Sequence, residues 1–157
     1  MNIRVARQED LVEMKQLYVN TIHSVCKNQY NESQLIAWSS SSQNDQRWQE
    51  MISTQYVLIA EINNQIVGFA TLKEGNYIDF FYVHKDFQRR GIANELLSRI
   101  ESEAKSYNTQ VLTSDVSMTA KTFFEKNGFV VVKEQENIRK DVVLINYKMK
   151  KENKHWL

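Results

Sequence analysis

The sequence predicts a single α/β domain in which helices flank a central mixed, mostly antiparallel sheet. Three patterns favour this class. Residues 9–25 and 92–104 carry apolar side chains at helical spacing, residues 56–83 form β-rich runs joined by short turns, and a strand, a helix and a strand follow one another over residues 77–114. Because no Pro- or Gly-rich linker interrupts the chain, we expect one domain over residues 1–150.

The first third of the chain is expected to be mainly helical. A short strand at Ile3–Val5 leads into an amphipathic helix over Glu9–Val25. Weaker helical patterns follow at Glu32–Trp38 and Asp45–Ile52, and the polar stretch Ser39–Asn44 is typical of a loop between them.

A three-stranded meander comes next. The β-rich runs Tyr56–Ile62 and Gln65–Leu72 are joined by Asn63 and Asn64, which tolerate the left-handed conformation of a tight hairpin. After a Glu-Gly-Asn turn, Tyr77–Val83 is almost wholly apolar, as in a strand covered on both faces.

The rest of the chain completes the sheet. A helix from Ile92 and a strand at Val111–Ser114 form a right-handed crossover, which places that strand parallel to the one at residues 77–83. A last helix is expected over Ser117–Lys126, ended by Gly128. Phe129–Lys133 and Val142–Met149 then form an antiparallel pair. The charged tail from Lys150 onward, residues 151–157 above all, is expected to fray.

Composition excludes several function classes. With 20 Lys and Arg against 19 Asp and Glu, the chain has no long-range field to gather a polyanion, so neither a nucleic-acid partner nor a membrane partner is indicated. The lone Cys26 excludes an intrachain disulfide and a thiolate metal site, and we expect no metal. The N-terminus lacks a signal peptide's apolar stretch, so we expect a cytoplasmic protein.

The chemistry is concentrated between the strand ending at Val83 and the following helix. There Gly91 and Ala93 let a ligand approach the backbone, and the helix start presents unpaired N–H groups with partial positive charge. Arg89 and Arg90 add fixed charge, which indicates a phosphate or diphosphate site. The plainer interpretation is a tight turn with solvated arginines. The loop is neither a Walker loop nor a Rossmann fingerprint.

Two segments carry a family resemblance. Gln88-Arg89-Arg90-Gly91-Ile92-Ala93 resembles the Gln/Arg-x-x-Gly-x-Gly/Ala loop of the GNAT superfamily of N-acetyltransferases, and residues 120–129, AKTFFEKNGF, resemble its Ala-x-x-Phe-Tyr-Glu-Lys-x-Gly-Phe segment. With the order of elements, the resemblance covers residues 2–150. The Phe-Phe-Glu variant is similar to a group of small bacterial acetyltransferases whose acceptors are mostly unassigned.

The resemblance implies acetyl-CoA as cosubstrate. Main-chain N–H groups of the loop would hold the diphosphate, and the pantetheine arm would lie beside the strand, where the Val83 N–H would face the thioester carbonyl. The implied cofactor-binding residues are Phe81, Tyr82, Val83, Gln88, Arg89, Arg90, Gly91, Ile92, Ala93, Asn94, Phe123 and Phe124.

The catalytic base and acid are less clearly marked. We favour Asp79 as base, since it is the acidic residue in the apolar strand and alternation predicts that it shares a face with Phe81 and Val83. Asp79 as a solvated or strand-anchoring residue, and His84 or His23 as base, remain alternatives. Phe124 stands where many GNAT enzymes have a Tyr acid; either another group, with Ser117 and Tyr82 as candidates, protonates the thiolate, or no acid is needed.

Acceptor binding is expected from the first helices. Tyr30, Trp38 and Trp48 are candidates for the cleft lining, and Glu32 is a candidate for attracting an ammonium group. The hypothesis is therefore acetyl transfer to a primary amine of a small molecule or peptide by direct attack, without an acetyl-Cys26; homodimerisation is left open. The rival hypotheses are a non-catalytic acyl-CoA sensor and a nucleotide-binding protein unrelated to CoA.

Overall fold

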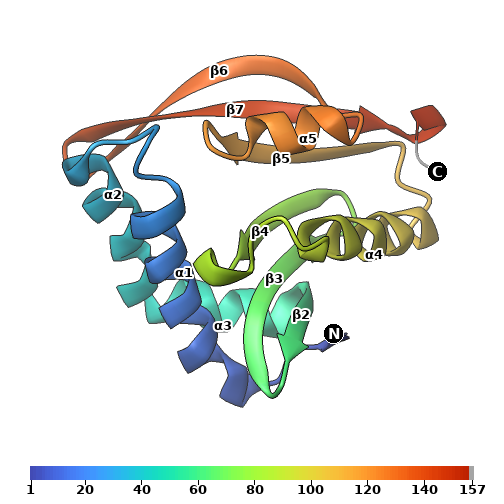
Figure 1. The fold of residues 1–157 in the computed structure, drawn as a ribbon. Helices are drawn as coiled ribbons and strands as arrows, with labels where there is room; N and C mark the ends of the chain where they lie inside the picture. The colour runs from blue at the N-terminus through green and yellow to red at the C-terminus, as the bar shows by residue number, and fades with distance from the viewer. Residues whose placement is uncertain (156–157) are drawn as a thin grey trace.

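The computed structural model describes residues 1–155 and consists of one twisted sheet with helices on both faces (Figure 1). The elements, in order, are β1 (Asn2–Val5), η1 (Gln8–Asp10), α1 (Leu11–Val25), α2 (Glu32–Ser39), η2 (Ser40–Gln43), α3 (Asp45–Thr54), β2 (Tyr56–Ile62), β3 (Gln65–Lys73), β4 (Tyr77–Val83), η3 (Lys85–Phe87), α4 (Ile92–Ser106), β5 (Val111–Ser117), α5 (Lys121–Lys126), β6 (Val130–Arg139), β7 (Val142–Glu152) and η4 (Asn153–His155).

The seven strands lie in the order β1-β2-β3-β4-β5-β7-β6. The β4–β5 pair is parallel and every other neighbouring pair is antiparallel. This confirms the expected mixed, mostly antiparallel sheet and the crossover through α4. The hairpin between β2 and β3 is also as expected, with Asn63 and Asn64 at φ values of 52° and 64°.

Several expected boundaries were wrong. The stretch expected as a loop at Ser39–Asn44 is largely the 3-10 turn η2. β5 continues to Ser117, so that residue ends a strand, and α5 begins only at Lys121. β6 and β7 are longer than expected because they form a long two-stranded ribbon.

The prediction of a frayed tail was wrong for its first residues. Lys150–Glu152 continue β7 and pair with the start of β5. The Lys151 ammonium is buried and lies 2.7 Å from the Glu101 carboxylate on α4. Lys151, which was expected to lie in a frayed tail, is therefore buried, because Glu101 on α4 supplies its counter-ion.

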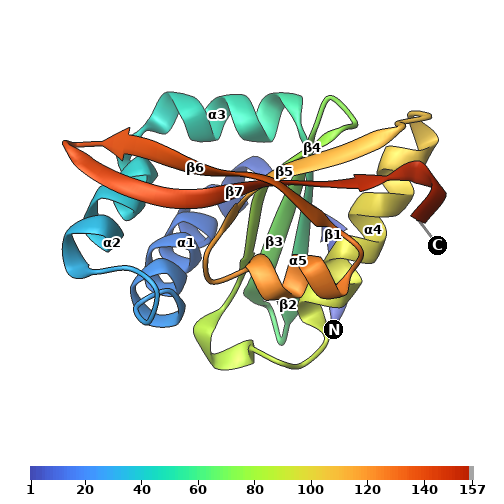
Figure 2. The same ribbon diagram turned by 90° about the horizontal axis from the view of Figure 1, so that it is seen from above.

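The sheet separates two hydrophobic cores. One lies under α4 and α5 and is built around residues such as Leu96, Ile100 and Phe124. The other lies under α1, α2 and α3 and includes Tyr18 and Trp48. Figure 2 shows α3 and α4 on opposite sides of the strands. A ligand that crosses the sheet would therefore contact residues of both hydrophobic cores.

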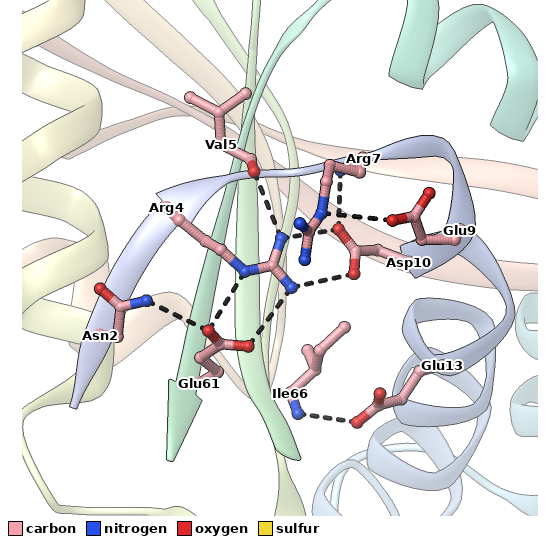
Figure 3. Close-up of polar contacts among 9 residues, drawn as sticks. All are labelled: Asn2, Arg4, Val5, Arg7, Glu9, Asp10, Glu13, Glu61 and Ile66. Atoms are coloured by element: carbon pink, nitrogen blue, oxygen red, sulfur yellow. Dashed lines mark hydrogen bonds and ion pairs between the residues drawn. The ribbon is translucent and has the colours of Figure 1, made fainter. Parts of the chain in front are cut away.

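An ionic cluster holds β1 to the rest of the domain (Figure 3). The Arg4 guanidinium lies 2.8 Å from the Asp10 carboxylate and 3.2 Å from that of Glu61. Asp10 also accepts the backbone N–H of Arg7 at 2.7 Å. These hydrogen bonds, the one from Arg4 first, lower the pKa of Asp10 and outweigh its burial. Glu13 similarly accepts the Ile66 N–H from β3 at 2.7 Å.

Candidate active site

The sheet opens between its two central strands. β4 and β5 pair only at Tyr77↔Thr113 and Ile78↔Ser114, although both strands continue for several residues. The Ser114 hydroxyl donates to the Ile78 carbonyl at 2.9 Å, at the end of the paired segment. Beyond this point the strands diverge, as the separation of β4 from β5 in Figure 1 shows. Backbone groups of β4 that would normally bond to β5 thus face open space.

A cavity of about 190 Å³ lies at this opening. Both cores contribute to its wall, since Phe81 and Phe124 belong to the α4 side and Tyr18, Phe80 and Tyr82 to the α1–α3 side. The lining residues are Tyr18, Tyr30, Trp38, Ser41, Arg47, Tyr77, Asp79–Tyr82, Ser114–Ser117, Ala120, Phe124, Asn137, Arg139 and Leu144–Asn146. The cavity therefore joins the two faces of the sheet.

A β-bulge in β4 redirects Asp79. Leu72 of β3 pairs with Ile78, but Ala70 pairs with Phe81, so two residues of β4 stand opposite Thr71. The Thr71 hydroxyl accepts the Phe80 N–H at 3.0 Å inside the bulge. The expectation that Asp79 shares a face with Phe81 was wrong, because the extra residue breaks the alternation. Phe81 packs on the α4 core, while Asp79 contacts α3.

The Asp79 carboxylate is fully engaged by donors. Arg47 approaches it with two guanidinium nitrogens at 2.9 and 3.3 Å, and the Gln55 amide donates at 2.7 Å. The Asp79 side chain is 8% exposed and that of Arg47 is 42% exposed. Arg47 also lies over the Phe80 ring, 4.6 Å from its centroid. This geometry favours the anchoring interpretation of Asp79, because both of its carboxylate oxygens are already occupied by donors from Arg47 and Gln55.

Backbone geometry supports the expected role of the Val83 amide. The next amide, that of His84, donates to Val67 of β3 at 2.8 Å. Since successive N–H groups along a strand point to opposite sides, the Val83 N–H points away from β3, toward the side where β5 has diverged. The Val83 carbonyl accepts from the Gln88 amide at 2.7 Å and from the Thr21 hydroxyl at 3.3 Å. The end of β4 is thus fixed from both faces.

The loop before α4 presents a row of backbone donors. Arg89 and Gly91 have φ values of 61° and 81°, which turn the chain sharply into the helix. Within residues 1–155, no acceptor is found for the N–H groups of residues 88–94, and Glu95 makes the first helical bond, to Gly91. A Cβ at Gly91 would have no heavy atom within 4 Å. The space in front of these amides therefore fits an anion such as a diphosphate.

A row of polar side chains lines the wall formed by β5, β6 and β7. The Gln135 amide donates to Asp115 at 2.9 Å and to Asn146 at 3.0 Å, and the Asn137 amide donates to Asn146 at 2.9 Å. Asp115 also accepts the Tyr77 hydroxyl at 2.8 Å. Burial, together with the neighbouring Asp115 carboxylate, raises the pKa of Tyr77.

Sequence reasoning missed Asp115 and Arg139. The strand was ended too early, at Ser114, so Asp115 was left out of it. Its position in a β-rich run was the available signal, the same one that marked Asp79. Nothing local marks Arg139, which reaches the cavity only through the pairing of β6 with β7.

Comparisons with known proteins agree with this architecture. A family model described as an acetyltransferase (GNAT) domain matches residues 26–151. The chain belongs to the GNAT acetyltransferase family. The uncharacterised N-acetyltransferase YafP of Escherichia coli K12 is 32% identical over 156 residues, which are 99% of this chain and 98% of YafP.

Solved GNAT structures match the fold closely. A GCN5-related N-acetyltransferase from Rhodopseudomonas palustris is 30% identical, with a TM-score of 0.92 over 96% of this chain and 94% of its own. PaiA N-acetyltransferase from Thermoplasma acidophilum, solved in complex with coenzyme A, is 19% identical, with a TM-score of 0.76 over 97% of this chain and 99% of its own. These matches confirm the family resemblance drawn from the two motifs.

In this GNAT chain, Phe124 is a core residue. It is 2% exposed and makes edge contacts with Phe81, Phe123 and Phe129 at centroid distances of 5.5, 5.4 and 5.1 Å. Phe123 is partly buried and lies 5.7 Å from the Phe81 ring. The aromatic cluster shapes the α4 side of the cavity and offers no proton.

The two proton-donor candidates both line the cavity. The Ser117 hydroxyl accepts the Ala120 N–H at 3.1 Å and so also shapes the turn before α5. Tyr82 packs 4.9 Å from the Tyr18 ring, and burial raises the pKa of its phenol well above the usual value. The phenol therefore stays protonated at neutral pH, and its raised pKa makes it a weaker acid than an ordinary tyrosine.

Neither histidine candidate lines the cavity. His23 Nε2 lies 2.9 Å from the Ser39 hydroxyl, between α1 and the end of α2. His84 Nδ1 accepts the Asp86 N–H at 3.0 Å and caps η3. Both side chains have structural partners outside the site.

Of the four residues expected to bind the acceptor, two line the cavity and two do not. Tyr30 and Trp38 line the cavity with rings 5.3 Å apart. The Tyr30 hydroxyl, however, donates to Ile145 O at 2.6 Å and accepts the Met118 N–H at 2.9 Å, and burial raises its pKa to about 12. Trp48 is fully buried and Glu32 is exposed; neither is part of the lining.

Proposed function

We propose that the chain is an acetyl-CoA-dependent N-acetyltransferase that acts on a primary amine by direct attack in a ternary complex. The cavity that joins both faces of the sheet carries this proposal. The amide-rich loop lies at the start of α4, on the α4 side of the sheet and outside the cavity lining, while polar and aromatic residues from α1, α2 and α3 line the cavity on the other side. Two substrates entering from opposite faces would meet at the end of β4.

The fit to the cosubstrate rests on the loop and on β4. Acetyl-CoA supplies the acetyl thioester. The unpaired amides of residues 88–94, with Arg89 and Arg90, are suited to the diphosphate, and the unpaired edge of β4 at Phe81–Val83 is suited to an extended amide-bearing arm. That the GNAT relative PaiA was solved with coenzyme A supports this assignment.

We assign oxyanion stabilisation, proton donation and proton acceptance to different residues around the end of β4. The Val83 N–H stabilises negative charge on the carbonyl oxygen as the amine nitrogen attacks the carbonyl carbon. Tyr82 or Ser117 supplies a proton to the departing sulfur. Asp79 or Asp115 accepts the proton of the attacking ammonium. Asp115 is the more exposed of the two carboxylates, and its hydrogen-bond donors are the neutral side chains of Tyr77 and Gln135, so it is better placed than the arginine-paired Asp79 to take this proton.

Thermal unfolding with acetyl-CoA, CoA, ATP and NADH at matched concentrations tests the cofactor site. A ligand that binds only the folded state raises the transition temperature. Selective stabilisation by acetyl-CoA and CoA is expected, and equal or greater stabilisation by ATP would favour a nucleotide-binding protein instead. Release of free thiol from acetyl-CoA, measured over a panel of primary amines, then tests the transfer itself.

A second function, a non-catalytic acyl-CoA sensor, is favoured by one observation: the buried Phe124 has no hydroxyl to offer as an acid. The sensor hypothesis predicts saturable CoA binding without amine-dependent thiol release. We favour catalysis, because a CoA-like thiol has a pKa of roughly 8.5 and leaves readily near neutral pH, and because Tyr82 and Ser117 line the cavity.

Direct transfer also predicts that the protein itself is not acetylated. Cys26 is 4% exposed, and burial raises its pKa to about 11, so little reactive thiolate exists at neutral pH. Denatured protein recovered after incubation with acetyl-CoA alone should carry no acetyl group on Cys26. Stoichiometric acetylation of that thiol would overturn the direct mechanism.

A further inference from the structure

The acceptor face of the cavity contains two arginines from opposite directions. Arg47 projects from α3, and Arg139 comes from the end of β6, next to the turn into β7. This is the face of the α1–α3 core, opposite the α4 loop proposed for the diphosphate. The charge of these residues is therefore presented to the second substrate rather than to the cosubstrate's diphosphate.

The two guanidinium groups differ in their partners. Arg47 is neutralised by Asp79 through two hydrogen bonds. Arg139 donates to the Ser41 hydroxyl at 2.9 Å, and no ion pair joins it to any carboxylate in the described part of the chain. One positive charge at the cavity wall is thus left without a counter-charge.

Arg139 is exposed at the last position of β6, and the polar residues before it on the strand are held by hydrogen bonds. Gln135 and Asn137 occupy alternate positions on the same strand and are locked together through Asn146. Ser41, the hydrogen-bond partner of Arg139, is itself held in place, because the Trp48 indole N–H donates to the Ser41 backbone carbonyl at 3.0 Å. A guanidinium anchored at one edge keeps further N–H donors free for a ligand, in a planar fork that matches a carboxylate.

Arg139 lines the same cavity as Tyr18 and Tyr82, and Tyr82 is the residue before Val83 at the end of β4. The guanidinium therefore shares one cavity with the last residues of β4, where the amine would attack. An anionic group bound at Arg139 would lie on the same small molecule as the reacting amine.

We propose that the acceptor is a carboxylate-bearing primary amine, an amino acid or a close analogue, whose carboxylate is bound by Arg139 on the acceptor face. This deepens the proposed function and rests on it. A carboxylate matches the site better than a phosphate, because Arg139 is the lining arginine without an ion pair in the described part of the chain, the Asp115 carboxylate lines the same cavity, and a phosphate monoester carries nearly two negative charges at neutral pH. The carboxylate would select the acceptor and take no part in the transfer.

Matched acceptors test this class directly. L-Amino acids and β- and γ-amino acids are compared with their decarboxylated amines, their methyl esters and the phosphate-bearing amine phosphoethanolamine, by thiol release from acetyl-CoA. We expect at least one amino acid to have a kcat/KM about 10- to 100-fold above that of its decarboxylated amine, the range for one charge-assisted pair. Equal or better use of the decarboxylated amines, or a preference for phosphoethanolamine, would overturn the proposal.

Variants then assign the preference to the residue. Arg139→Gln should raise KM for the amino acid about 10- to 100-fold with little change in kcat, and should leave the KM for the decarboxylated amine unchanged. Arg139→Lys should restore part of the preference. Arg99→Gln, which removes an exposed arginine of α4 outside the cavity, is the matched control. An unchanged preference in Arg139→Gln would contradict the assignment.

The proposed function fails separately. If CoA does not raise the unfolding temperature of the wild-type protein, the cofactor site is wrong. If CoA does so and no carboxylate-bearing amine is acetylated, the acceptor class is wrong while the cofactor site stands.

Discussion

Replacing Gly91 with alanine should separate cofactor binding from folding. Gly91 has a φ of +81°, and an added Cβ would meet no heavy atom within 4 Å. The cost to folding is therefore only the backbone strain of an L-residue in the left-handed region, about 1 kcal/mol. For a domain of this size, that lowers the unfolding temperature by about 2–4 °C. The new methyl group would, however, occupy the space proposed for the diphosphate.

The expected loss of binding can be expressed as a loss of stabilisation. At a CoA concentration 100 times its Kd, binding adds about 2.7 kcal/mol to the free energy of unfolding. If the methyl group weakens binding about tenfold, the same CoA concentration adds about 1.4 kcal/mol. The CoA-induced rise in unfolding temperature should therefore fall to about half, as measured by thermal unfolding with and without CoA.

Gly128→Ala is the matched control. Gly128 has a similar φ of +91°, and its added Cβ would lie 3.1 Å from Cε of Lys151, whose buried ammonium is ion-paired with Glu101. This variant should lose at least as much stability as Gly91→Ala but show a full CoA-induced shift, because residue 128 lies outside the α4 loop. A full CoA-induced shift in Gly91→Ala as well would refute the assignment of the loop as the diphosphate site.

Three further variants test other parts of the molecule. Asp115→Asn should lower kcat more than CoA affinity. The same result for Asp79→Asn alone would make Asp79 the base, and an unchanged kcat in both variants would exclude both. Tyr30→Phe leaves the Ile145 carbonyl and the Met118 N–H without the Tyr30 hydroxyl, so urea unfolding should show that the free energy of unfolding falls by about 1–3 kcal/mol. An unchanged free energy of unfolding would mean that water replaces the hydroxyl. The pKa of Asp10 is lowered in the folded protein, so its carboxylate contributes stability above its ordinary pKa near 3.8 and loses that contribution as the pH falls through the folded value. The loss of unfolding free energy in Asp10→Asn, measured in urea, should therefore be largest at pH 7 and shrink below about pH 4. A loss that does not depend on pH would contradict this linkage.

Local patterns determined much of the fold. The bounds of β4 follow from its apolar run, and the β2–β3 hairpin follows from two asparagines that both adopt positive φ. The turn before α4 was also evident, because Gly91 marks it and its geometry depends on the backbone of neighbouring residues. Features that depend on neighbours in sequence are accessible to pattern analysis, since the interactions that decide them lie within a few residues.

Tertiary structure decided which side chains meet in the site. The bulge that turns Asp79 toward Arg47 depends on how β4 pairs with β3, and periodicity along β4 alone predicts the opposite face. Arg139 enters the cavity through the register of β6 on β7, far in sequence from Ser41 and from β4. The sequence by itself therefore determined the family and indicated the loop that we propose for the diphosphate. The orientation of the carboxylates and the charge of the acceptor face were decided by contacts between residues distant in the chain.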